Sequence, residues 1–126
     1  MNDRPDATEL LEIARRTLLD DVLPRLPDDL RYSALMIANA MAIAAREHAA
    51  GDTDASAELA RLLEFYGEPR PTLAGSALRA ALSGYNQRLA ADIRAGRCDG
   101  WIGLRGHLAQ TTTDKLAIAN PKALDN

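Results

Sequence analysis

The chain has 126 residues, of which 47% are hydrophobic and 26% charged, and its net charge is −3. This composition is that of an ordinary globular protein and excludes a wholly disordered chain. The negative charge and the lack of a basic run argue against a nucleic-acid-binding protein, because lysine and arginine supply most of such affinity. The longest apolar stretch, 34–45, is interrupted by Asn39 and is too short to span a bilayer. We therefore expect no nucleic-acid partner and no membrane partner.

The cysteine count, the N-terminus and the length narrow the class of protein further. Cys98 is the single cysteine, so neither an internal disulfide nor a multi-cysteine metal site can form. Residues 1–6 are polar and lack the apolar stretch of a secretory signal. We therefore expect a cytoplasmic protein. The chain has the commonest domain size, which predicts a single domain over residues 1–126.

The balance of residue types favours helices over strands, because alanine is abundant and aromatic residues make up only 4% of the chain. A first helix is predicted to start at the capping residue Asp6, three positions before Glu9, and to end before Pro24 and Pro27. Its apolar positions recur at helical spacing and are Ala7, Leu10, Leu11, Ala14 and Leu18.

The second predicted helix is the most apolar segment of the chain. Asp28 and Asp29 are the expected caps at its start, and Gly51 is expected to end it shortly after His48. From residue 30 to 45 the segment is apolar almost all round, and such a helix is usually surrounded by others. Its alanines would let neighbouring helices approach closely. We therefore predict an all-α fold, a compact bundle of about five helices around this apolar central helix.

Three further helices complete the predicted fold. A short third helix spans about residues 54–66 and ends at Gly67, and a fourth spans 78–93. Gly84 weakens the fourth helix by about 1 kcal/mol relative to alanine, which allows a break there. A last helix spans about 101–119. Its predicted apolar stripe consists of Trp101, Leu104, Leu108, Thr112 and Leu116.

No group of residues has the spacing of a catalytic or metal site. The serines lack the sequence context of a hydrolase nucleophile, and the glycines between 96 and 106 fit a capped turn better than a phosphate-binding loop. His48 and His107 are the only histidines, and a distant Glu47 does not complete a metal site with them. Cys98 has no neighbouring base, so we interpret it as a passive thiol. The sequence therefore predicts no catalytic residue, no cofactor and no metal.

Two polar side chains lie within apolar helical stretches. A buried Asn39 amide would have to find partners or lose roughly 1–3 kcal/mol. In one interpretation it bonds a loop carbonyl or a helix end and fixes register. In the other it belongs to a pocket or interface, with Arg31, Tyr32 or Arg46 of the same helix. For Lys115 we favour snorkelling along its own aliphatic stem.

Three blocks carry a resemblance to known sequences: ANAMAIAARE at 38–47, NQRLAADIRAG at 86–96, and LAQTTTDKLAIANP at 108–121. Together they resemble a bacterial family of small helical proteins without an assigned function, although residues 52–83 match it poorly. The resemblance implies an accessory role, with genes beside aminoglycoside-phosphotransferase-like kinases and acyl-CoA dehydrogenases, and it supplies no catalytic residues. The candidate pocket or interface residues are Tyr32, Asn39, Arg46, Glu47, Asn86, Lys115 and Asn120.

Two hypotheses of function follow. The leading one is a non-catalytic helical interaction protein that forms a homodimer and assists a neighbouring enzyme of acyl-CoA or phosphotransfer metabolism, because catalytic constellations are lacking and such short helical architectures commonly dimerise. The alternative is a small-molecule-binding protein or minor enzyme with a pocket between helices, lined by Asn39, Tyr32, Arg46 and Lys115. Helix-turn-helix DNA binding ranks last because of the negative net charge.

Overall fold

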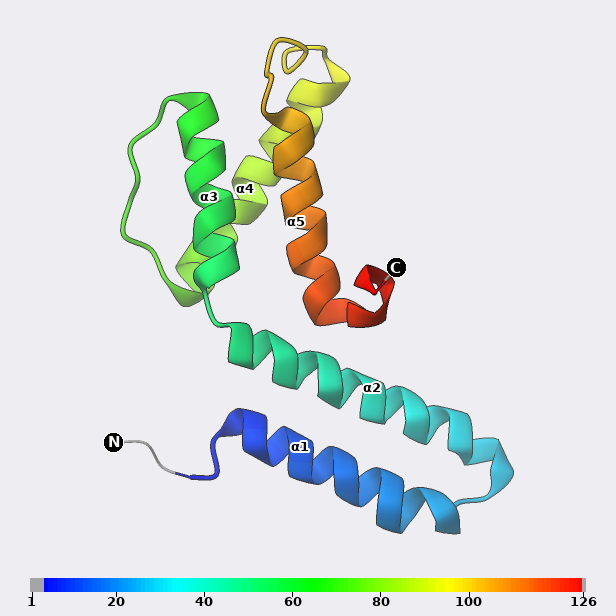
Figure 1. Cartoon of the computed structure of the whole chain (residues 1–126). Coiled ribbons are helices and arrows are strands. Elements are labelled where there is room, and N and C mark those ends of the chain that lie inside the picture. Colours follow the sequence, from blue (N-terminus) through cyan, green and yellow to red (C-terminus); the bar gives the residue numbers. More distant parts are fainter. Residues whose placement is uncertain (1–3, 126) are drawn as a thin grey trace. The chain divides into compact units, whose positions relative to one another are not determined.

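The computed structural model describes residues 4–125, and over these residues the chain is all-α and contains no strand (Figure 1). The prediction of an all-α fold with about five helices is confirmed. The five helices are α1 (Ala7–Thr17), α2 (Asp28–Ala50), α3 (Thr53–Tyr66), α4 (Gly75–Arg94) and α5 (Leu104–Ala119). A π-helical segment (Leu18–Val22) and a 3-10 turn (Leu23–Arg25) follow α1, and a second 3-10 turn (Pro121–Leu124) follows α5.

The chain divides into two compact units, with a boundary between Gly51 and Asp52. The sequence predicted a single domain over residues 1–126. We call the part up to residue 51 the hairpin unit and the part from residue 52 the three-helix unit. None of the helices in residues 4–125 is both long and apolar enough to cross a membrane.

The hairpin unit consists of α1 and α2, which pack against each other in antiparallel directions (Figure 1). The predicted cap at the start of α1 is confirmed, because the Asp6 carboxylate accepts a hydrogen bond of 2.9 Å from the Glu9 N–H. The predicted caps of α2 are shifted. Pro27 occupies the cap position, and Asp28 and Asp29 lie in the first turn, where their charges favour the helix dipole.

The helix α2 forms as predicted, but it is not enclosed all round. Its buried residues are the alanines Ala34, Ala38 and Ala45. Leu35, Met36 and Ile37 are each about half exposed, at 49%, 49% and 50%. The physical reason is that α1 is the helix packed along α2 within this unit, and one partner covers one face only. The alanine face permits the closest approach and is therefore the buried one.

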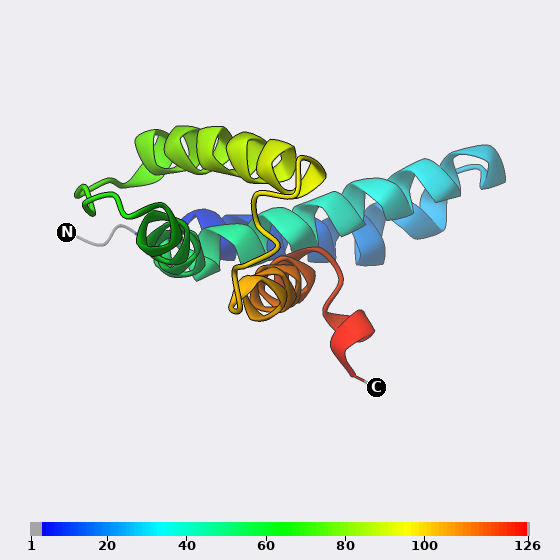
Figure 2. The same cartoon turned by 90° about the horizontal axis from the view of Figure 1, so that it is seen from above.

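The three-helix unit is built from α3, α4 and α5, with α4 lying across the other two when they are viewed nearly end-on (Figure 2). The N–H of Gly75, the first residue of α4, donates to the side chain of Asp52, at the start of α3, over 3.0 Å. Helices α3 and α4 therefore begin at the same end of the unit. The segment 67–74, which we call the connector, consequently runs back along the whole of α3.

The core of the three-helix unit is a leucine cluster shared by α3 and α4. Leu62 is fully buried, and Leu78 is 1% exposed. Gly84 causes no break, and α4 is continuous. The buried members of the cluster are Leu59, Leu62, Leu63, Leu78, Leu82, Leu89 and Cys98.

The buried face of α5 differs from the predicted apolar stripe. The helix begins at Leu104, and Trp101 lies in the preceding turn, stacked on Phe65 with ring centroids 4.0 Å apart. Leu108 is 42% exposed, whereas His107 is buried. The stripe prediction was wrong there because α3 presents polar side chains to α5, and these pair with polar partners, as described below.

Candidate functional site

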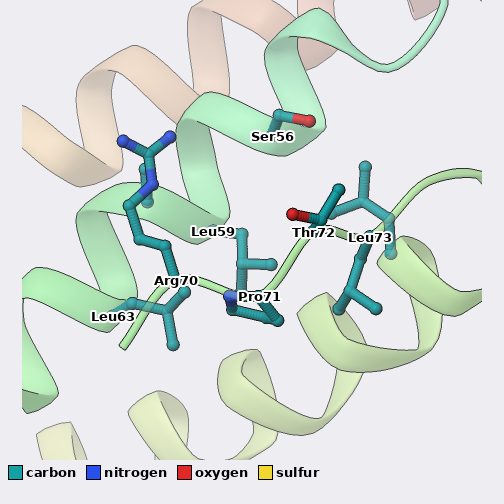
Figure 3. Close-up of a pocket in the computed structure, with 9 residues that line it drawn as sticks. Ser56, Leu59, Leu63, Arg70, Pro71, Thr72 and Leu73 are labelled. Atoms are coloured by element: carbon teal, nitrogen blue, oxygen red, sulfur yellow. The ribbon is translucent and has the colours of Figure 1, made fainter. Parts of the chain in front are cut away.

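Two hollows flank the connector, with volumes of about 330 and 250 Å³. Four residues line both of them, namely Leu59, Leu63, Arg70 and Pro71. We call the two hollows together the connector cleft. Leu59 and Leu63 are core residues, so the floor of the cleft is apolar. Ser56, Arg70 and Thr72 also line the larger hollow and add polar groups to it (Figure 3).

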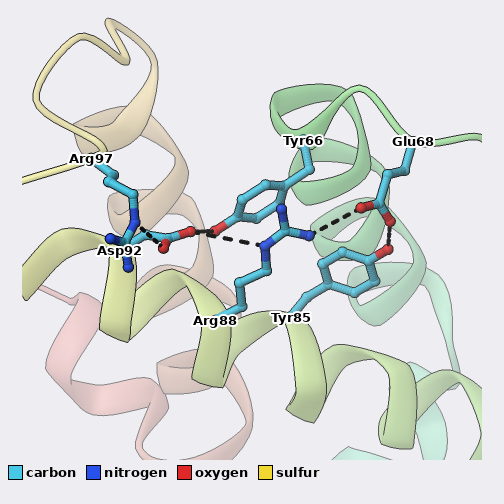
Figure 4. A network of polar contacts seen from close by, with 6 residues as sticks. All are labelled: Tyr66, Glu68, Tyr85, Arg88, Asp92 and Arg97. Atoms are coloured by element: carbon cyan, nitrogen blue, oxygen red, sulfur yellow. Dashed lines mark hydrogen bonds and ion pairs between the residues drawn. The ribbon is translucent and has the colours of Figure 1, made fainter. Parts of the chain in front are cut away.

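The connector is fixed near both of its ends. At one end, the Glu68 carboxylate accepts hydrogen bonds from the Tyr85 hydroxyl and, over 3.0 Å, from the Arg88 guanidinium (Figure 4). At the other end, Asp52 receives the Gly75 N–H. Pro69 and Pro71 each fix a backbone φ between these anchors. The walls of the connector cleft are therefore largely preformed.

A polar network at the far end of α4 ties this helix to α3. The Tyr66 hydroxyl donates to Asp92 over 2.5 Å, and Arg97 donates to the same carboxylate over 2.7 Å. The Arg88 guanidinium lies 3.8 Å from the centre of the Tyr66 ring (Figure 4). Burial and the bond to Asp92 raise the pKa of Tyr66 to about 12. The same bond, together with Arg97, lowers the pKa of Asp92, so both groups keep their structural roles at neutral pH.

A second polar cluster lies inside the three-helix unit and is centred on Glu58. This carboxylate of α3 is 6% exposed, and it accepts a 3.3 Å hydrogen bond from the Asn86 amide of α4. Its other oxygen lies 3.9 Å from the ammonium group of Lys115 on α5. The sequence-predicted candidates Asn86 and Lys115 are thus brought together, by a residue that the sequence reasoning did not select.

Next to Glu58, a buried histidine is held by an arginine. The Arg61 Nε donates to His107 Nδ1 over 2.9 Å, and a terminal nitrogen of Arg61 donates to Thr111 over 3.1 Å. Burial and the charge of Arg61 lower the pKa of His107, whereas Glu58 acts in the opposite direction. The imidazole is therefore neutral near pH 7, and Nδ1 serves as an acceptor. This arrangement locks α3 onto α5.

The remaining predicted site residues do not join these clusters. Tyr32, Asn39, Arg46 and Glu47 belong to α2 in the hairpin unit. Asn39 is exposed, so the prediction of a buried amide was wrong for this chain. Asn120 is exposed at the end of α5, where its N–H donates to the Leu116 carbonyl over 2.8 Å. The side chain of Lys115 is 69% exposed and reaches out to solvent, in line with the predicted snorkelling.

Sequence reasoning missed Glu58, Arg61 and Arg70, although one signal was present. Glu58 is three residues after Ala55 and four before Leu62, so it falls on the apolar stripe of its helix. A charged residue at such a position needs a partner when buried. Arg70 gives no such signal, because its role depends on the path of the connector.

Two observations concern metal binding and thiol chemistry in the described residues. No group of three or more His, Cys, Asp or Glu residues in 4–125 has a geometry suited to a metal ion. Cys98 is buried, and burial together with the charges of Asp92 and Asp99 raises its thiol pKa, as expected for an unreactive cysteine.

A comparison with known protein families gives a match to this chain. Residues 24–123 match a family described as Domain of unknown function (DUF6285). The chain belongs to the DUF6285 family. The predicted resemblance to a family without an assigned function is thereby confirmed. The matched part of this DUF6285 chain includes α2 to α5 and leaves α1 outside. No curated protein and no solved structure matches the chain.

Proposed function

We propose that this DUF6285 chain is a non-catalytic helical interaction protein that forms a homodimer through its hairpin unit. The observation that carries the proposal is the exposure of large apolar side chains on an otherwise apolar helix. Leu35, Met36 and Ile37 are half exposed, and Tyr32 is 73% exposed. Monomeric soluble proteins rarely leave such a set of side chains uncovered on one element.

Exposed large apolar side chains are concentrated in the hairpin unit. Of the large apolar side chains that are exposed in the described residues, eight lie in the hairpin unit: Leu10, Ile13, Val22, Leu30, Tyr32, Leu35, Met36 and Ile37. Five of these eight side chains belong to α2, so most of the exposed apolar surface of the hairpin unit lies on the helix that the proposed dimer uses.

A second copy of the hairpin is the occupant that suits this surface best. Two hairpins packed through α2 pair the two α2 helices, so that each α2 gains a neighbour on the face that α1 leaves uncovered. On α2, the residues Tyr32, Met36, Asn39 and Ile43 follow a spacing of four, three and four, which is the spacing of a coiled-coil seam. Asn39 would then lie in the seam, where a single asparagine fixes register and partner number at some cost in stability.

The cellular role that we attach to this module is assistance to a neighbouring metabolic enzyme. The proposal rests on the resemblance described above, which implies a bacterial family with genes beside phosphotransferase-like kinases and acyl-CoA dehydrogenases. Action in the reducing cytoplasm suits a chain whose one cysteine is buried and unpaired. Pull-down from a host lysate tests this part. Repeated recovery of the chain alone, under conditions that preserve complexes, would count against the accessory role.

Self-association is tested by sedimentation velocity over a range of protein concentrations. We expect the wild-type chain to be a dimer, and Met36→Lys to weaken the dimer by at least about tenfold, because an unpaired ammonium group would be buried in the interface. Leu108→Lys is the matched control, since it places the same charge on an exposed leucine of the three-helix unit. A monomeric wild-type chain at high concentration, or equal effects of the two substitutions, would overturn the proposal.

A further inference from the structure

We infer that the connector cleft binds a small amphipathic carboxylate, whose apolar body lies on the leucine floor and whose anionic head meets Arg70. This site lies wholly within the three-helix unit. It is independent of the hairpin surface and of the proposed dimer.

The shape of the cleft sets the size of the ligand. The larger hollow has a volume of about 330 Å³, at the lower end of the range for small-molecule sites. A hollow of this size suits the short apolar chain of a small ligand, on the order of ten non-hydrogen atoms. The buried side chains of Leu59, Leu63 and Leu78 line it, so the part of the ligand that reaches the floor must be apolar.

Arg70 sets the charge of the ligand. Two other arginines near the connector pair with carboxylates, Arg79 with Asp52 and Arg88 with Glu68. No ion pair or hydrogen bond between described residues involves the side chain of Arg70, although this residue lines both hollows. A guanidinium binds a carboxylate with two parallel hydrogen bonds. One arginine matches one negative charge, which favours a carboxylate over a doubly charged phosphate.

The connector adds hydrogen-bond donors beside this arginine. No backbone–backbone hydrogen bond between described residues involves residues 69–73. The N–H groups of Arg70, Thr72 and Leu73 therefore keep their capacity to bond an acceptor. The hydroxyl of Thr72 also lines the larger hollow (Figure 3). Because both ends of the connector are anchored, little ordering is needed when a ligand binds.

Octanoate is the probe for this site, since its anion has a short apolar chain and about ten non-hydrogen atoms. We titrate the full-length chain with sodium octanoate and follow backbone amides by NMR. We expect saturable shifts at Ala60, Thr72 and Leu73, with a dissociation constant on the order of 1 mM. Octanamide, the neutral isostere, is expected to bind at least about tenfold more weakly because it lacks the charge-assisted pair.

Three variants separate this site from nonspecific binding. Arg70→Gln is expected to weaken octanoate binding about tenfold, and Ala60→Leu to weaken it by filling the larger hollow. Arg105→Gln removes an exposed arginine of α5 and is expected to leave binding unchanged. The inference is overturned if no saturable shift appears by about 10 mM, if octanamide equals octanoate, or if Arg70→Gln binds like the wild type. Shifts confined to α2 that are insensitive to Arg70→Gln would likewise overturn it.

Discussion

The two units of this chain are both built from helices, but they bury different kinds of side chain. In the three-helix unit, leucines of α3 and α4 interlock and are almost fully buried, and no buried side-chain N or O atom of the described residues lacks a hydrogen-bond partner. In the hairpin unit the fully buried residues are alanines, and large side chains such as Leu35, Met36 and Ile37 are half exposed. A helix pair whose fully buried residues are alanines gains less from the hydrophobic effect than one that buries leucines. Under the function proposed above, the hairpin unit therefore gains more from a partner than the three-helix unit does.

The largest effect on stability should come from a large-to-small substitution in the core of the three-helix unit. Leu62→Ala removes a fully buried side chain and is expected to lower the free energy of unfolding of this unit by about 3–4 kcal/mol. Trp101, the only tryptophan, lies in this unit against Phe65, so its fluorescence during urea unfolding reports on this unit. Leu108→Ala, at an exposed leucine, is the control and is expected to cost less than about 1 kcal/mol. Equal costs would contradict the assigned core.

A smaller effect is expected in the polar cluster around Glu58. Asn86→Leu leaves the buried Glu58 carboxylate without its amide donor and is expected to cost about 2 kcal/mol. Lys115→Met removes a partner that is largely solvated and 3.9 Å away, so we expect less than about 1 kcal/mol. The same fluorescence measurement ranks the two. If Lys115→Met proved the more costly, the cluster would depend on the ion pair and not on the amide.

In the hairpin unit, replacing Asn39 by leucine should stabilise the dimer, whereas replacing Asn86 by leucine destabilises the three-helix unit. If Asn39 lies in the proposed dimer seam, Asn39→Leu is expected to tighten the dimer by about 1 kcal/mol and to permit larger assemblies, because the polar group that fixes register is gone. Sedimentation equilibrium measures both changes. In the three-helix unit a polar-to-leucine change at Asn86 destabilises, so opposite signs at Asn39 and Asn86 would sharpen the contrast between the units. No change at Asn39 would remove it from the interface.

Much of the secondary structure was predictable because its signals are local. The cap at Asp6, the apolar spacing of Leu59, Leu62 and Leu63, and the left-handed Gly67 that ends α3 can each be recognised from a few neighbouring residues. The division into two units was not predictable in this way. The apolar character of α2 indicates that it needs covering, but it does not say whether the cover comes from the same chain.

The candidate site was harder to predict because its parts meet only in the folded chain. Asn86 and Lys115 were selected, yet their common partner Glu58 is far away in sequence. Likewise, His107 was considered only as a metal ligand, because nothing near it in sequence indicates the bond from Arg61. Helical periodicity identifies the face of each helix, but which faces meet depends on packing across the unit.

The smallest expected effect is a pH dependence of the three-helix unit. Burial and Arg61 lower the pKa of His107 below its ordinary value of about 6.5, so the unfolded chain binds a proton more readily than the folded one. Stability is therefore full above about pH 6.5 and declines as the pH falls below it. Asp92 acts in a separate window: its pKa is lowered, so its contribution is lost only as the pH falls below the ordinary value near 3.8.

Urea unfolding followed by Trp101 fluorescence between about pH 7 and pH 5 tests the histidine contribution, since this window excludes the titration of Asp92. His107→Gln is expected to lower the stability at pH 7 and to flatten the decline between pH 7 and pH 5, because glutamine cannot take up a proton. The acid limb below about pH 4 should persist in this variant, since Asp92 is unchanged. If the decline above pH 5 also persisted, another group would be responsible, and the Arg61–His107 bond would not be the contact that acid breaks.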